Sequence, residues 1–336
     1  MQADPLQVRR HRFMGRPITC GIALIVAALS AAPGYAQNYP TKPIRLIVSF
    51  APGGPTDIVA RIAAQKISEG IGQQVIVENR GGAGGTVGAE AAAKAPGDGY
   101  TLLLGTISTL GIAPSVYRNL GYDPRKSFAP VSLLTNAYFV IGANAASVPP
   151  TLREFIAQAK AAPGKFNFAS NGVGNITHIA GELFNMMAGV KLVHIPYKGS
   201  APAAADVAAG RAHVQFDVLP AFQQHIAAGK VRILAFAGPK RDAKLPDVPT
   251  TAEVGLPKFV LSAWFGLVAT AGSPDQAIRR LNAEVVRGLA ASDARDAILK
   301  LGLEPAAGTP EQFGALIAEE NARWMETVKA AGIKLE

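Results

Sequence analysis

The chain has 336 residues, of which 49% are hydrophobic and 17% charged, and its formal net charge at pH 7 is +9. This length allows one large or two ordinary domains, and the apolar content suffices for substantial hydrophobic cores. The lysines and arginines are scattered along the chain and form no basic run, which argues against a nucleic-acid-binding protein.

Residues 1–36 have the organisation of a secretory signal peptide. Four arginines precede the apolar stretch Ile18–Leu29, which is too short for a comfortable membrane span, and small residues close the segment at Gly34–Ala36. We therefore predict export, with cleavage after Ala36. Because this segment carries four arginines and one aspartate, its removal lowers the formal net charge to +6.

Cys20 is the only cysteine of the chain, and it lies inside the predicted signal peptide. It precedes the apolar core of that segment, whereas the cysteine of a lipoprotein signal follows the core, so we do not expect lipidation. The mature chain then has no thiol and forms no disulfide and no cysteine-ligated metal site. We expect neither a metal nor a cofactor.

The mature chain opens with a strand, a glycine loop and a helix. The apolar run Ile44–Phe50 is typical of a strand buried on both faces of a parallel sheet. Pro52–Pro55 break the strand, and apolar residues then recur at helical spacing through Ile67, which places Pro55 in the first helical turn. The free N–H groups of such a helix lie at the carboxyl edge of the sheet, where open α/β folds bind anions.

Two further units follow the same order. Gln74–Glu78 is the second predicted strand, and it leads through a second glycine loop into a helix ending near Ala95. Tyr100–Leu104 is the third predicted strand, followed by a loop at Thr106–Thr109. Three strand-loop-helix units at this spacing predict a parallel sheet with right-handed crossovers.

The middle of the chain predicts a passage into a second domain. Two apolar runs without an intervening helix lie within Phe128–Ala143, and we expect the second, Tyr138–Ala143 centred on Phe139–Ile141, to cross between domains. Helices and strands then alternate again from Thr151 to Phe236, which predicts a second α/β unit. The apolar strand Ser262–Ala269 carries the chain back, and the remainder is helical.

Two lobes joined by two crossing segments describe a hinged clamshell with a central cleft. The predicted fold class is α/β, with each lobe a mostly parallel sheet flanked by helices and with the two crossing strands as the hinge. We assign residues 37–139 and 260–336 to the first lobe and residues 140–259 to the second.

Six segments in this order carry a resemblance to a known family: YPTKPIRLIVSFAPGGPTDIVAR, VIVENRGGAGGTVGAE, SNGVGNITH, HIPYKGSAPA, LPDVPTTAEVGLP and WMETVKAAGIK. On them the mature chain resembles, over essentially its whole length, the substrate-binding receptors of tripartite tricarboxylate transporters, the Bug-type periplasmic receptors. The resemblance implies a type II-like, two-lobed periplasmic receptor. Such a receptor closes on a small carboxylate and delivers it to a separate membrane permease, without catalysis.

A carboxylate is held without a cation when backbone N–H groups and helix N-termini converge on it. The resemblance favours one loop from each lobe, Ala51–Asp57 and Ser170–Thr177. Gly53 and Gly54 would let the first loop approach the ligand closely, although the same glycines suit a plain tight turn. Asp57 is unusual in an anion site, and it could cap the helix, orient bridging waters or meet an amino group of the ligand. The ligand-binding candidates in this loop are Phe50, Ala51, Pro52, Gly53, Gly54, Thr56 and Asp57.

The second-lobe loop supplies hydroxyls, amides and flexible backbone. It is not a dinucleotide fingerprint, because Thr177 occupies the third glycine position. The related family commonly has threonine where Asn175 stands, and His178 suits packing or capping as well as ligand contact. The candidates in this loop are Ser170, Asn171, Gly172, Gly174, Asn175, Thr177 and His178.

Four further candidates come from other segments. Thr106 and Ser108 follow the third strand and could equally cap a helix. Tyr197 is placed to reach the mouth of the cleft, whereas we expect the neighbouring Lys198 to be solvated. Asp217 ends a second-lobe strand where the related family has a matching aspartate. Trp264, on the return crossing, is expected in the core.

The sequence argues against an enzyme, because the chain has no G-x-S-x-G motif, no H-E-x-x-H motif and no P-loop lysine, and the histidines of the mature chain are isolated from one another in sequence. The predicted function is therefore capture of a small carboxylate for a permease. The alternative is a ligand-loaded partner of a membrane sensor. Dicarboxylates, tricarboxylates, amino acids and aromatic acids all remain open as ligands, and nothing demands more than a monomer.

Overall fold

The structure is a computed structural model that describes residues 1–3, 39–330 and 332. The body of the protein, Tyr39–Glu336, forms one compact unit. Apart from its first three residues, the predicted signal peptide lies outside the described residues, as do Cys20 and the cleavage site after Ala36. In the described part of the chain, no helix combines the length and the hydropathy of a membrane span.

The first lobe has a parallel core of three strands, β1 (Ile44–Val48), β2 (Val75–Asn79) and β3 (Thr101–Thr106), with β1 in the middle. The helices α2 (Pro55–Ile71) and α3 (Thr86–Ala93) connect them. Crossover helices make successive strands parallel, as the sequence predicts. β3 is buried along its whole length and β1 along nearly all of it, which explains their continuous apolar runs.

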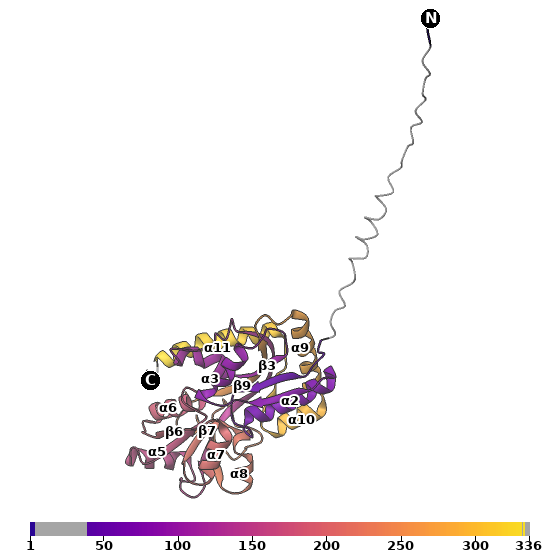
Figure 1. The fold of residues 1–336 in the computed structure, drawn as a ribbon. Helices are drawn as coiled ribbons and strands as arrows, with labels where there is room; N and C mark the ends of the chain where they lie inside the picture. Colours follow the sequence, from indigo (N-terminus) through magenta and orange to yellow (C-terminus); the bar gives the residue numbers. More distant parts are fainter. Residues whose placement is uncertain (4–38, 331, 333–336) are drawn as a thin grey trace. The chain divides into compact units, whose positions relative to one another are not determined.

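The second lobe repeats this plan. Its parallel core is β6-β5-β7, with β5 in the middle, and Figure 1 shows helices α5 to α8 gathered around it. The strands are β5 (Asn167–Ser170), β6 (Val193–Pro196), β7 (Val214–Val218) and β8 (Val231–Phe236). The helices are α5 (Leu152–Ala161), α6 (Ile176–Ala188), α7 (Ser200–Ala208) and α8 (Gln223–Ala227).

One long strand, β4 (Phe128–Asn144), runs through both lobes. Its part up to Tyr138 pairs antiparallel with β9 (Ser262–Thr270), and its part from Phe139 onward pairs antiparallel with β7 and β8. The predicted crossing strand is therefore confirmed, and the two apolar runs seen in the sequence form one continuous strand. β9 makes the return crossing and pairs antiparallel with β3 and β4.

The resulting strand order is β2-β1-β3-β9-β4-β7-β5-β6. Each lobe thus keeps a parallel core, while every pairing made by the crossing strands is antiparallel. Antiparallel neighbours need no crossover helix between them, so the crossing strands can run against the strands they join. This is the two-lobed α/β fold with hinge strands that the sequence predicts.

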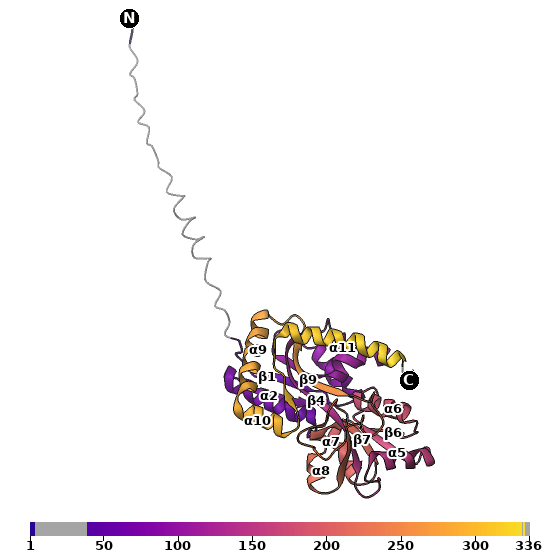
Figure 2. The same cartoon turned by 180° about the vertical axis from the view of Figure 1, so that it is seen from behind.

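The C-terminal helices cover the first lobe, as Figures 1 and 2 show from opposite sides. They are α9 (Asp275–Ala290), α10 (Ser292–Lys300) and α11 (Pro310–Ala330). A two-residue strand, β10 (Glu304–Pro305), lies between α10 and α11 in the chain and pairs with β4. α11 buries one apolar stripe, at Phe313, Ile317, Trp324 and Val328. Phe313 meets the Trp264 ring of β9 edge to face, with ring centroids 5.4 Å apart.

Candidate functional site

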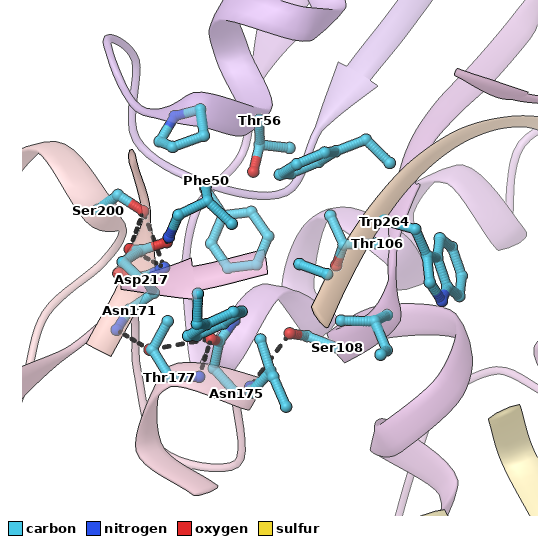
Figure 3. Close-up of a pocket in the computed structure, with 17 residues that line it drawn as sticks. Phe50, Thr56, Thr106, Ser108, Asn171, Asn175, Thr177, Ser200, Asp217 and Trp264 are labelled. Atoms are coloured by element: carbon cyan, nitrogen blue, oxygen red, sulfur yellow. Dashed lines mark hydrogen bonds between the residues drawn. The ribbon is translucent and has the colours of Figure 1, made fainter. Parts of the chain in front are cut away.

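A small cavity lies between the lobes, at the carboxyl ends of their parallel strands. The cavity has a volume of only about 30 Å³, because the lobes are closed upon each other. Figure 3 shows polar side chains of both lobes pointing toward it. The polar lining consists of Thr56, Thr106 and Ser108 from the first lobe and of Asn171, Asn175, Thr177, Ser200 and Asp217 from the second.

Four helical segments begin at this cavity. A polar residue of each first turn lines it: Thr56 of α2, Ser108 of the six-residue helical turn η2 (Ile107–Ile112), Thr177 of α6 and Ser200 of α7. No lysine or arginine lies among the described residues that line the cavity. Backbone N–H groups at helix N-termini are therefore the main source of positive potential in the site.

These helical starts differ in their capping. Thr106 caps η2 and Asn175 caps α6, because their side chains accept from the backbone N–H groups of Thr109 and Thr177. By contrast, α2 and α7 begin after the glycines Gly54 and Gly199, and neither receives a side-chain cap. The first N–H groups of α2 and α7 thus remain available to an anion in the cavity.

Most N–H groups of the loop Ser170–Thr177 are hydrogen-bonded within the loop or to the adjacent His178, and not to the cavity. Asn171 N donates to Thr177 Oγ1 at 2.8 Å, Gly172 N to Ser170 Oγ at 3.2 Å and Gly174 N to His178 Nδ1 at 3.3 Å. In the closed form this loop therefore offers side chains rather than backbone donors to the cavity. The sequence predicts hydroxyls, amides and flexible backbone from this loop; its side chains line the cavity, whereas the free backbone donors of the second lobe lie at the start of α7.

The lobes touch directly through glycine loops. Ala51 N of the first lobe donates to Lys198 O of the second at 3.1 Å. A Cβ on Gly172 would stand 2.9 Å from Gly84 N, and a Cβ on Gly54 would stand 3.3 Å from Ser200 Cβ. The glycines are thus placed for lobe–lobe approach, a role that the sequence prediction did not give them.

Tyr117 adds a side-chain contact across the closed cleft. Its hydroxyl lies 2.9 Å from Ala83 O in the first lobe and within hydrogen-bond distance of Val173 O in the second. Ser108 Oγ likewise crosses between lobes, accepting from Ile176 N at 3.2 Å. Tyr117 was not among the sequence-predicted residues, since a lone tyrosine far from the glycine loops gives no signal.

Asp57 does not line the cavity, and its carboxylate is fully engaged. It accepts from Gly53 N at 3.0 Å, from Arg61 Nε at 2.9 Å, from Arg61 Nη2 at 3.0 Å and from Asn79 Nδ2 at 2.9 Å. Although burial opposes the charge, these hydrogen bonds lower the pKa of Asp57. Among the three roles left open by the sequence, the geometry favours a structural one, in which Asp57 braces the first loop.

Asp217 is the only carboxylate among the described cavity-lining residues. Its Oδ2 accepts from Ser200 Oγ at 2.6 Å, from Gln215 Nε2 at 2.9 Å and from Asn171 Nδ2 at 3.1 Å, and its Oδ1 accepts from Val218 N at 2.8 Å. Burial nevertheless raises the pKa of Asp217. The cluster turns the acidic oxygens toward donors of the second lobe, as the dashed lines in Figure 3 show.

His178 and His194 stack on each other with ring centroids 3.9 Å apart. Burial lowers the pKa of His178 to about 4, and burial together with His178 lowers that of His194 to about 3. Ser170 Oγ lies 2.6 Å from His194 Nε2, whereas the hydrogen bonds to Asp217 come from Ser200, Gln215, Asn171 and Val218 N, so the serine, the two histidines and the acid do not form a hydrolase-like site. His178 lies outside the cavity lining and serves packing and capping, one of the roles that the sequence left open.

Eight sequence-predicted residues line the cavity: Phe50, Thr56, Thr106, Ser108, Asn171, Asn175, Thr177 and Asp217. The other predicted residues support it from outside or lie away from it: Ala51, Pro52, Gly53, Gly54, Asp57, Ser170, Gly172, Gly174, His178 and Tyr197. Tyr197 donates to Asp206 Oδ2 at 2.7 Å. Among residues 39–330, no group of three or more histidine or acidic side chains is placed to hold a metal.

Ser200 is the main polar residue that sequence reasoning missed. It follows β6 and Gly199 at a helix start, in the same strand-glycine-helix order as the other loops, and this order was the available signal. The cavity also has an apolar part that no motif marks. It is formed by Pro55, Ile107, Phe139, Ile176, Val218, Ala263, Trp264 and Phe265.

Comparison with known proteins places this arrangement in a class of transport receptors. Residues 59–333 match the family described as "Tripartite tricarboxylate transporter family receptor", and the chain belongs to this family. It is 38% identical over 317 residues to "Protein BugT" of Bordetella pertussis, covering 94% of this chain and 97% of BugT.

Solved structures of similar proteins share the fold. One is R. palustris Rpa4515 with adipate, at a TM-score of 0.85 and 35% identity, covering 88% of this chain and 99% of that one. Another is MatC from Rhodopseudomonas palustris with bound malate, at a TM-score of 0.83 and 34% identity, covering 86% and 100%. Both ligands named for these proteins are small dicarboxylates.

Proposed function

We propose that this protein is a periplasmic substrate-binding receptor that captures a small carboxylate between its lobes for a tripartite tricarboxylate transporter. The observation that carries this proposal is the pair of uncapped helix starts, α2 from one lobe and α7 from the other, at a buried cavity whose described lining includes no lysine or arginine. An anionic group bridging them would gain from both N-termini at once.

The proposed ligand is a small di- or tricarboxylate, with amino acids and aromatic acids as further candidates. The limited volume of the closed cavity favours a compact molecule. Adipate and malate in two proteins of similar sequence and fold support the dicarboxylate class. Ser200 and Asn171 donate to Asp217 in the closed structure. They can donate instead to the second polar end of such a ligand when that end replaces the aspartate as their acceptor.

Closure is the proposed signal to the membrane partner. A ligand that touches both lobes binds the closed state more strongly than the open one and therefore shifts the population toward closure. The proposed hinge is formed by β4 and β9 between lobes comprising residues 37–139 with 260–336 and residues 140–259. The permease would recognise the closed form of a monomeric receptor.

The N-terminal segment supports export, and we propose cleavage after Ala36. We propose no catalytic activity, consistent with a family of solute-binding receptors. A second candidate role, as ligand-loaded partner of a membrane sensor, uses the same closed form. Co-purification of the ligand-loaded receptor with either a permease or a sensor distinguishes the two roles.

The experiment is a thermal-shift screen of the mature protein, beginning at Gln37, after removal of any co-purified ligand by partial unfolding and refolding. Ligand binding to the native state alone stabilises it by about 2.7 kcal/mol at a hundredfold excess over Kd. We expect one class of small carboxylates to raise the melting temperature and to be recovered unchanged. A flat response to all di- and tricarboxylates, amino acids and aromatic acids would refute the proposal.

A further inference from the structure

A second and much larger cavity lies at the hinge, outside the cleft. This hinge pocket has a volume of about 650 Å³, within the range of about 300–1,000 Å³ that is typical of ligand sites. Its walls are the crossing strands around Tyr138 and Trp264, the loop 239–244 after β8, and the helix α11 at Leu316 and Glu320. Both lobes therefore contribute to it.

The hinge pocket is separated from the ligand cleft by a single strand. Among the described residues, Ala263 and Trp264 of β9 alone line both cavities. The Trp264 ring packs on Phe313 of α11, so it stands on the side of β9 that faces α11. Its Nε1 is buried and has no hydrogen-bond partner. An occupant of the hinge pocket would thus touch the residues that also bound the cleft.

The floor of the hinge pocket is aromatic. Tyr138 is 41% exposed although it lies in the middle of a strand. Its ring meets Phe236 edge to face with centroids 5.8 Å apart. Leu133, Ala137 and Leu316 continue the apolar lining. Exposed rings of this kind favour a ligand with its own aromatic body.

One rim of the pocket is basic. The loop 239–244 carries Lys240, Arg241 and Lys244, and of these Arg241 is paired with Glu253. Among the described residues, neither Lys240 nor Lys244 has a carboxylate within 4 Å, but Lys244 Nζ donates to Leu299 O, and Asp242 of the same loop accepts from Lys244 N. The acid of α11, Glu320, is already bound by Arg323 and Trp324. Lys240 therefore carries the one ammonium group of this wall that has no partner among the described residues, and it lines the pocket together with the aromatic floor.

We propose that the hinge pocket is a second ligand site, distinct from the cleft, that binds an aromatic carboxylate with its ring on Tyr138 and Phe236 and its carboxylate at Lys240. This goes beyond the proposed transport function. Because the loop 239–244 and α11 belong to different lobes, opening or closing the hinge changes the width of the pocket. Occupancy is coupled to the cleft, so each ligand alters the affinity of the other by the same factor.

The test uses 2-naphthoate, whose own fluorescence reports binding, titrated with the mature protein and followed by anisotropy. We expect saturable binding that Lys240→Glu weakens about tenfold or more, because the substitution replaces attraction by repulsion at the rim. The matched control is Lys230→Glu, which makes the same charge change at an exposed turn outside the pocket lining. Ala243→Phe, also on the exposed loop, should block the pocket without disturbing the core.

Two comparisons separate this site from the alternatives. Gly54→Val obstructs the cleft and holds the lobes apart, so 2-naphthoate should still bind saturably in that variant, with an affinity altered only by the coupling to the hinge. Loss of binding in Gly54→Val with normal binding in Lys240→Glu would mean that the probe occupies the cleft, which overturns the proposal. Absence of saturable binding, equal loss in both lysine variants, or equal affinity for uncharged 2-naphthol would overturn it as well.

Discussion

Gly54→Val tests whether lobe closure depends on the contact between the starts of α2 and α7. Gly54 has φ −86° and ψ 173°, an extended conformation that valine adopts readily, so the substitution does not strain the backbone. A Cβ at this position would already lie 3.3 Å from Ser200 Cβ and 3.6 Å from Ala201 N. The two γ-methyl groups of valine would extend into the same gap and hold the lobes apart.

The expected loss follows from the number of lobes that contact the ligand. A receptor with micromolar affinity gains about 8 kcal/mol on binding, and a receptor that cannot close keeps the contacts of roughly one lobe. The variant should then lose about 4 kcal/mol, or about a thousandfold in affinity. Its melting temperature without ligand should stay close to that of the parent, because the folded lobes are unchanged.

Isothermal titration with the carboxylate identified by the screen measures this loss, and small-angle scattering with and without ligand measures closure. The control is Lys198→Ala, since Lys198 is exposed and only its backbone oxygen meets the other lobe. It should bind like the parent. If Gly54→Val bound the carboxylate with a Kd within threefold of the parent's, our inference that closure depends on the α2–α7 contact would be wrong.

Three further predictions concern the contacts around the cleft. Tyr117→Phe removes the hydroxyl that meets Val173 O, so ligand dissociation should accelerate about fivefold in stopped-flow measurements while the association rate changes little, the net worth of one hydrogen bond being about 1 kcal/mol. Asp57→Asn should lower the free energy of unfolding by about 1–3 kcal/mol in urea titrations, because a buried charged acceptor of four hydrogen bonds is lost; an unchanged midpoint would contradict its bracing role. His178 and His194 have pKa values of about 4 and about 3 in the fold, below the ordinary 6.5, so the unfolded chain binds more protons and stability should fall as the pH drops from 6.5 toward 4. Replacing both histidines by glutamine should flatten that part of the stability profile.

The lobes could be predicted because their determinants are local. A continuous apolar run followed by glycine and a helical period, as at Ile44–Ile67, indicates a buried strand and a crossover helix wherever it occurs. The crossing at Phe139 was also visible, since two apolar runs without a helix between them fit no α/β unit. The exact path was not visible, because β4 is a single strand only through its pairing with strands more than 70 residues away.

The site was predicted in part, and the misses share a physical cause. Alternating strands and helices were predicted through this region, but β6 has only four residues and none of them is buried, so the local pattern does not indicate that Ser200, at the start of α7, lines the cavity. Which N–H groups remain free depends on contacts distant in the chain, such as Ile176 N donating to Ser108 Oγ across 68 positions. The role of Asp57 likewise depends on Asn79, which comes from the next strand. Composition and spacing cannot resolve such contacts.

The choice of residue at each helix start links the sequence to closure. A serine, threonine, asparagine or aspartate at the N-cap stabilises a helix by about 0.5–2 kcal/mol relative to alanine. Thr106 and Asn175 provide such caps, whereas α2 and α7 begin after glycines and lack them. In the open form, water can satisfy the free N–H groups of α2 and α7. The closed cavity has room for few water molecules, so closure removes most of this water. Without ligand, the closed form therefore has two helix N-termini whose N–H groups are poorly satisfied. A carboxylate satisfies both, and it does so only when the lobes meet. Filling either end with a side-chain cap would therefore stabilise the empty closed form and weaken the dependence of closure on ligand.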